Sequence, residues 1–125
     1  MIMLFDRLGR LLLALLFLAG AAQKGIDPAP AQALLADWGL PVWLIWPALV
    51  FNAVGALCLI SGVWLGPVAL ALAGYCAVTS LFHFIPSDPW QMSILVKNLA
   101  IAGGLLCLAA RAMSQTDARN GAPFS

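Results

Sequence analysis

The sequence predicts an all-α integral membrane protein, a four-helix bundle with a short interfacial helix between its first and second spans. Hydrophobic residues make up 63% of the 125 residues and charged residues 9%, whereas soluble domains carry roughly a quarter charged residues. The apolar residues fall into long runs, and a helix crosses a bilayer with about 20 such residues. We expect one membrane domain, residues 1–113, and a flexible cytoplasmic tail, residues 114–125.

The first apolar run predicts a span over residues 8–24. Its positive lead, apolar stretch and small residues before Ala22 also fit a cleavable signal peptide. We favour retention, because the run continues back through Leu8 and forward to Lys24, whose aliphatic stem can extend to the membrane interface.

The next segment, residues 25–41, predicts a helix that lies along the membrane surface. Asp27 followed by Pro28 is typical of a helix start, and Gly39 with Pro41 is typical of a helix end. One face of this helix is apolar and ends in a tryptophan, which suits the headgroup region. The residues of that face are Ala31, Leu34, Leu35 and Trp38.

The middle of the chain predicts a second span over residues 42–64 and a third over residues 68–84. Tryptophans near both ends of the second span resemble an aromatic belt. Between the spans, Gly66 suits a left-handed helix cap and Pro67 suits the first position of the next helix. We therefore expect a turn at residues 65–67.

The fourth span is predicted over residues 90–112, with Asp88 as N-cap and Gln91 as its capping-box partner. Its one interior charge is Lys97, which shares a helical face with Ala100, Gly104 and Cys107. Small residues mark the sides on which membrane helices approach each other. We therefore expect Lys97 to point into the bundle, where a cation needs a partner.

Basic residues near the span ends predict the orientation. Arg7 and Arg10 precede the first span, and Arg111 and Arg119 follow the last. Under the positive-inside rule, both termini are cytoplasmic. The expected location is the bacterial inner membrane, which the chain crosses several times.

Polar residues lie in stripes on the predicted spans, which favours a polar, outward-facing pocket inside the bundle. On the third span, Cys76, Thr79, Ser80 and His83 follow one face. The candidate ligand-binding residues are Lys24, Asn52, Ser80, His83, Lys97 and Asn98. The candidate helix-packing glycines are Gly20, Gly55, Gly62, Gly103 and Gly104.

Each of these residues also has a purely structural interpretation. Ser and Thr in membrane helices often bond to their own backbone carbonyls, and asparagines often join neighbouring helices. Lys97 could also extend outward to the interface. One histidine and three cysteines without a C-x-x-C motif predict no metal site, and we assign no catalytic residue. A net charge of +1 gives no indication of the strongly basic surface that nucleic-acid binding requires.

Several segments in order resemble the DoxX family. They are Arg10 to Lys24, Gly39 to Pro41, Gly55 to Gly62, His83, and Lys97 to Leu106. The resemblance implies a small bundle of four membrane helices, related to membrane subunits of thiosulfate:quinone oxidoreductases and often linked to redox systems. Two positions depart from the family pattern. Asn52 stands where members commonly carry a glutamate, and Leu65 with Gly66 stands where an arginine is common.

The leading hypothesis is a membrane subunit or partner of a quinone-linked redox system that is not an enzyme on its own. Quinone is the candidate cofactor, and the expected partners are the lipid bilayer and a redox subunit or further copies of the chain. One alternative is a non-catalytic structural or assembly subunit. Another is a small-anion permeation protein that works as an oligomer, which the outward cationic face suggests.

Overall fold

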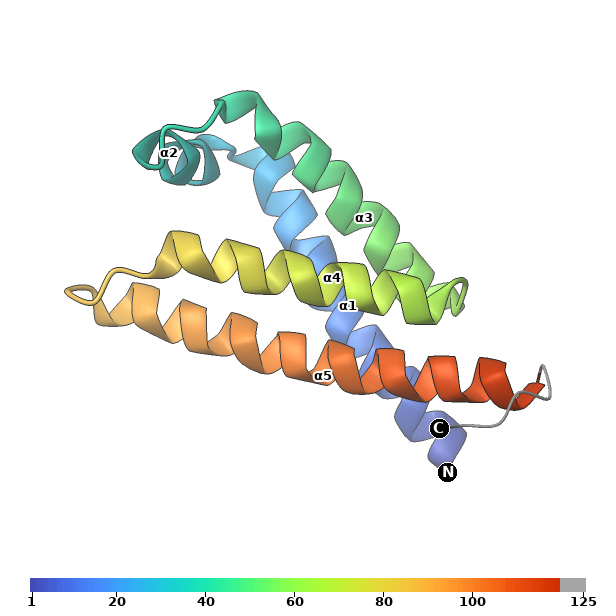
Figure 1. The fold of residues 1–125 in the computed structure, drawn as a ribbon. Helices are drawn as coiled ribbons and strands as arrows, with labels where there is room; N and C mark the ends of the chain where they lie inside the picture. The colour runs from blue at the N-terminus through green and yellow to red at the C-terminus, as the bar shows by residue number, and fades with distance from the viewer. Residues whose placement is uncertain (120–125) are drawn as a thin grey trace. The chain divides into compact units, whose positions relative to one another are not determined.

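A computed structural model describes residues 1–119, with side chains through residue 115, and these residues are helical with no strand. The all-α prediction is therefore confirmed for this part of the chain. The helices are shown in Figure 1. In order they are α1 (Ile2–Ile26), α2 (Ala29–Asp37), η1 (Val42–Leu44), α3 (Ile45–Ser61), α4 (Leu65–Ser80), η2 (Leu81–His83) and α5 (Pro89–Arg119).

The chain divides into two compact units. The N-terminal unit, Met1–Gly62, holds α1, α2, η1 and α3, and the C-terminal unit begins at Val63 and holds α4, η2 and α5. Each unit is a pair of long helices joined by a shorter connection. Figure 1 shows α4 and α5 side by side in the C-terminal unit.

Within the described residues, three helical segments are long and apolar enough to cross a membrane. These are Val42–Ser61, Leu65–His83 and Pro89–Gln115, and they correspond to the second, third and fourth predicted spans. The helix predicted as the first span, α1, is not among them. It starts at Ile2, six residues before the predicted boundary, and its first three turns carry Asp6, Arg7 and Arg10.

In the N-terminal unit, α1 packs against α3. The buried side of α1 carries Ala14, Phe17 and Ala21, spaced at three and four residues as one helical face requires. The buried side of α3 repeats the same spacing in Asn52, Gly55, Ala56 and Leu59. Small residues on both helices let the backbones approach closely.

The connecting helix α2 begins and ends near the predicted residues. Gly39, with a positive φ of 72°, follows the helix as expected of a C-terminal glycine. The N-cap is Pro28 rather than Asp27, whose backbone N–H ends α1 by bonding to the carbonyl of Gln23. Whether α2 lies at the membrane surface stays a prediction.

The turn between α3 and α4 forms three residues earlier than the predicted turn at residues 65–67. Gly62 takes the left-handed conformation at the end of α3, with φ of 83°, and Trp64 is also left-handed, with φ of 51°. Leu65 and Gly66 then belong to α4. Pro67 is tolerated there because the first backbone N–H groups of a helix have no intrahelical acceptor.

Replacing Gly62 by alanine is expected to lower the free energy of unfolding by about 1–2 kcal/mol, the cost of a left-handed non-glycine residue. The added Cβ would also lie 3.0 Å from Nη1 of Arg10. The measurement is denaturant unfolding in detergent, followed by circular dichroism.

The matched control is Gly74→Ala in α4, where a Cβ meets no atom within 4 Å. Alanine there should be neutral or should stabilise the helix by up to about 1 kcal/mol. Equal stability of the Gly62→Ala variant and the native chain would contradict the assignment of Gly62 as a cap.

In the C-terminal unit, α4 packs along α5. Asp88 caps α5 as predicted, since its Oδ1 accepts hydrogen bonds from the backbone N–H groups of Trp90 at 3.0 Å and Gln91 at 3.5 Å. The reciprocal half of the capping box is not formed, because the N–H of Asp88 already bonds to the carbonyl of Ile85. The helix runs to Arg119, beyond the predicted start of the tail, and residues 120–125 of that tail lie outside the described residues.

Candidate functional site

In the N-terminal unit, polar side chains from α1 and α3 lie close together around Gly20 of α1. A Cβ added to Gly20 would lie 3.3 Å from Nδ2 of Asn52 on α3 and 3.7 Å from Nζ of Lys24. Asn52 is 2% exposed, so its amide is held inside the protein. The packing of α1 on α3 brings these three residues together within the N-terminal unit.

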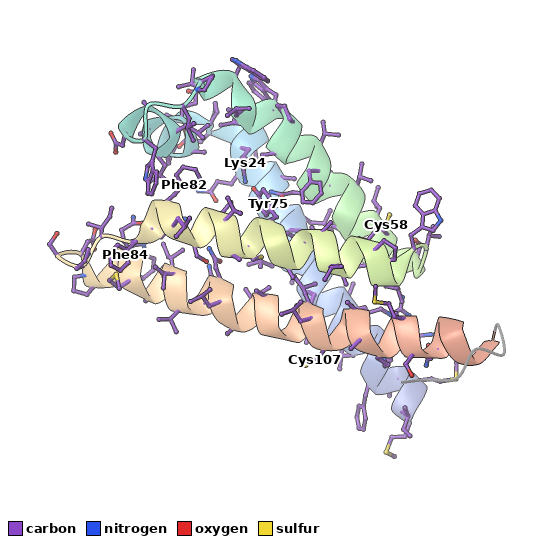
Figure 2. The ribbon with its side chains drawn as sticks, viewed as in Figure 1. Lys24, Cys58, Tyr75, Phe82, Phe84 and Cys107 are labelled. Atoms are coloured by element: carbon purple, nitrogen blue, oxygen red, sulfur yellow. The ribbon has the colours of Figure 1, made fainter. Side chains whose placement is uncertain are left out.

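Lys24 lies at the C-terminal end of α1, close to α2 (Figure 2). Its ammonium donates a long hydrogen bond of 3.5 Å to the carbonyl of Gly20, four residues earlier. No other hydrogen bond or ion pair joins this ammonium to the residues that the structure describes. Since an ammonium has three N–H donors, most of its donor capacity stays available.

The cluster offers mainly hydrogen-bond donors. Nζ of Lys24 is a donor only, whereas the amide of Asn52 has two N–H donors and an acceptor oxygen, Oδ1. The two nitrogen atoms come from different helices and meet over a glycine without a side chain. The Lys24 ammonium suits a group that accepts hydrogen bonds, such as a carbonyl oxygen or an oxyanion.

At the other end of the same helix pair, Arg10 joins α1 to α3. Its Nη1 donates a 2.9 Å hydrogen bond to the carbonyl of Leu59 in the last turn of α3. Its Nε donates to Oδ2 of Asp6 at 3.1 Å. The cation therefore satisfies a carbonyl at the negative end of the α3 dipole. Neither bond was predicted from the sequence.

In the C-terminal unit, the polar stripe on α4 follows the buried side of the helix. Cys76 and Ser80 are buried, and Thr79 is half-buried. The hydroxyl of Ser80 donates to the carbonyl of Cys76 at 2.7 Å, and that of Thr79 donates to the carbonyl of Tyr75 at 2.8 Å. Because both donors are used within α4, the structural interpretation fits these two residues.

His83 ends η2 and contacts the first turn of α5. Its Nδ1 lies 2.6 Å from Oε1 of Gln91. An amide oxygen is an acceptor only, so the ring nitrogen is the donor in this bond. Gln91, predicted as a capping residue, instead holds the orientation of the imidazole.

Within the α4–α5 unit, the face of α5 that carries Lys97 is not the one that packs on α4. Its direction into the bundle stays a prediction. Within the α4–α5 unit, Lys97, Gly104 and Cys107 are exposed, and Asn98 is half-buried. The buried side of α5 instead carries Ala102, Leu105, Leu108 and Ala109. The larger apolar area of the leucines favours this side for packing.

The five predicted packing glycines differ in their surroundings. Gly20 lies against Asn52, Gly55 is buried in α3, and Gly62 is a helix cap. A Cβ at Gly103 or Gly104 would meet no atom within 4 Å. These two glycines therefore do not serve packing within the α4–α5 unit, and their role in packing against other helices stays a prediction.

An open groove lies along the exposed side of α3, lined by apolar residues. These are Trp46, Pro47, Val50, Phe51 and Val54. None of the predicted ligand-binding residues lines it, so it is not the predicted polar pocket. A pocket that gathers all six candidate residues stays a prediction.

The residues missed as site members are Asp6 and Gln91. Asp6 is four residues before Arg10, a spacing that brings opposite charges together on a helix. Gln91 follows His83 by eight residues across a short turn. The first signal was readable in the sequence, whereas the second depends on the geometry of the turn.

Comparison with known proteins supplies the context for these sites. The family model described as DoxX matches residues 5–85, which reach from α1 through η2. The chain is 29% identical over 101 residues to an Escherichia coli (strain K12) protein named inner membrane protein YqjF, covering 80% of this chain and 78% of that protein. No solved structure matches the chain.

Proposed function

Since this chain belongs to the DoxX family, we propose that it is a multi-pass inner-membrane protein that binds a quinone-like ligand as a subunit or partner of a redox system. In this proposal α1 is a fourth span, α2 lies at the outer surface, and both termini are cytoplasmic. The relative named as an inner membrane protein supports the location. The redox setting comes from the family resemblance.

The observation that carries the proposal is the convergence of Lys24 and Asn52 over Gly20. A quinone presents carbonyl oxygens, which accept hydrogen bonds and have none to donate. The ammonium and the amide N–H groups are the complementary donors. A ligand oxygen between them would also give the Lys24 cation the polar partner that a membrane environment demands.

The proposal ranks Lys24 above Lys97 as the ligand-binding cation. Lys24 lies beside a buried amide on a neighbouring helix, whereas Lys97 is exposed on α5 and makes no hydrogen bond with the residues described. Of the remaining candidates, Ser80 has its hydroxyl bonded to Cys76. The quinone site is therefore assigned to the N-terminal unit.

The test is titration of decylubiquinone into protein in lipid nanodiscs, with empty nanodiscs as the baseline. Lys24→Met and Asn52→Leu should each weaken binding at least tenfold, a loss of about 1.4 kcal/mol or more. The matched control is Lys97→Met, which removes the same charge from α5 and should bind as the native chain does. Equal losses in all three variants would contradict the site.

A structural or assembly subunit is the second candidate function. It is favoured by the hydroxyl bonds within α4 and by the Arg10 bonds, all of which are satisfied inside the protein. It predicts that the native chain binds no decylubiquinone. It also predicts that Asn52→Leu changes the free energy of unfolding or the retention of a partner subunit.

A further inference from the structure

The first turns of α1 continue past the end of α3. Arg10 is the residue of α1 that reaches the last turn of α3, where its Nη1 donates to the carbonyl of Leu59. Residues 2–9 precede this bond and extend the helix by about 12 Å at the usual rise of an α-helix. Figure 1 shows α1 running on to the N-terminus beyond the end of α3. We call residues 2–9 the N-terminal extension.

The N-terminal extension has a charged side and an apolar side. Asp6 and Arg10 form an ion pair on the charged side, which continues the face of α1 that packs on α3. At about 100° per residue, Leu4, Phe5 and Leu8 lie on the opposite side of the helix. These three residues are 64%, 62% and 49% exposed. The apolar side of the extension is therefore not covered by the residues that the structure describes.

Arg7 lies where the two sides meet, and its side chain is exposed. Within residues 1–115, no hydrogen bond or ion pair joins the Arg7 guanidinium to another residue. The neighbouring carboxylate, Asp6, is already bonded to Arg10. The extension therefore presents one uncompensated positive charge at the edge of its apolar side.

We propose that the N-terminal extension binds the surface of an anionic membrane leaflet. Its apolar side enters the boundary between the lipid headgroups and the acyl chains, as amphipathic helices at the interface do. The Arg7 guanidinium donates hydrogen bonds to a lipid phosphate. The inference rests on the proposed function only in taking α1 as a span, and it does not involve the quinone site.

The residue types favour lipid over a second protein helix as the occupant. Contacts between membrane helices use small residues, which let the two backbones approach closely. The apolar side of the extension carries leucine and phenylalanine instead, and it continues along α1 in residues that are each at least 50% exposed, namely Leu11, Leu12 and Leu15. A lipid phosphate also complements the charge of a guanidinium that has no carboxylate partner.

Spin labels at two adjacent residues test where the apolar side lies. Leu4→Cys places a label on the apolar side, and Met3→Cys places one on the charged side of the same turn, at residues that are 64% and 68% exposed. Both are made in a chain with Cys58, Cys76 and Cys107 replaced by alanine. In nanodiscs that contain phosphatidylglycerol, power-saturation electron paramagnetic resonance should find the label at residue 4 more accessible to oxygen than to an aqueous nickel chelate. The label at residue 3 should show the reverse.

A third label, introduced by Leu15→Cys, separates this inference from the proposed function. Leu15 lies near the middle of α1, so its label should be deep in the lipid if α1 spans the membrane. A water-accessible label there would contradict the span and, with it, this inference. A deep label at residue 15 together with a water-accessible label at residue 4 would overturn this inference alone. A label at residue 4 that is shielded from both reagents would also overturn it, because the occupant would then be protein.

Lipid retention tests the charge in a chain that keeps its cysteines. Native mass spectrometry of protein released from nanodiscs with equal amounts of phosphatidylglycerol and phosphatidylcholine should show phosphatidylglycerol retained in excess. Arg7→Gln should lower this excess by about fivefold, the contribution of one arginine near an anionic surface. The matched control is Lys97→Gln, which removes the same charge from an exposed residue of α5 and should keep the excess. An unchanged excess in Arg7→Gln, or an equal loss in Lys97→Gln, would overturn the phosphate contact.

Discussion

Replacing Arg10 by methionine should lower the free energy of unfolding by about 2–3 kcal/mol, because it removes charge-assisted hydrogen bonds that are each worth about 1.5–3 kcal/mol. The Arg10 side chain is 13% exposed and bonds to Asp6 and to the carbonyl of Leu59. Methionine keeps much of the aliphatic volume but offers no donor. The last turn of α3 would lose the side chain that satisfies its carbonyl and opposes its dipole.

The measurement is unfolding in detergent micelles by guanidinium chloride, followed by far-ultraviolet circular dichroism. Arg7→Met is the matched control, since Arg7 lies on the same helix and is exposed. It should change stability by less than about 0.5 kcal/mol. Similar losses for the two variants would show that Arg10 acts only through net charge.

Gly20→Ala should abolish most decylubiquinone binding, with affinity lowered at least tenfold, while the protein stays folded. The added Cβ would lie 3.3 Å from Nδ2 of Asn52, so the amide must move by a few tenths of an ångström. The methyl group would also occupy the space over which the two donors meet. Both charged and amide groups remain in this variant, so a loss of binding reports geometry rather than chemistry.

Gly9→Ala provides the control on the same helix, because a Cβ there meets no atom within 4 Å. Both variants gain helix propensity, by about 1 kcal/mol each. Binding should be lost only for Gly20→Ala in the nanodisc titration. If the two variants bind decylubiquinone equally well, the space over Gly20 is not part of a ligand site.

The faces on which α1 and α3 meet are visible in the sequence, because both helices carry their small and polar residues at helical spacing. Gly20 and Lys24 share a face of α1, and Asn52 and Gly55 share a face of α3. Such faces must be covered when a helix lies in an apolar solvent. The bond from Arg10 to Leu59 could not be predicted from the sequence. Every residue has a backbone carbonyl, so residue type does not indicate which carbonyl accepts a hydrogen bond.

In the α4–α5 unit, two sides of α5 are alternatives for the contact with α4. One side carries Lys97 and Gly104, and the other carries Ala102 and Leu105. The spacing of the residues identifies both sides but does not show which of them packs against α4. The α4–α5 contact favours the leucine side, which buries more apolar area.

The sequence by itself determined the helical class, the membrane character of three segments and the cap at Asp88, because composition, run length and capping chemistry act locally. Only the tertiary structure decided that Gly62 rather than Gly66 ends α3, and that the side chain of Gln91 bonds to His83 rather than to the backbone of Asp88. In both cases the local sequence permits two alternatives. Contacts with residues distant in sequence, such as Arg10 beside Gly62, decide between alternatives of this kind.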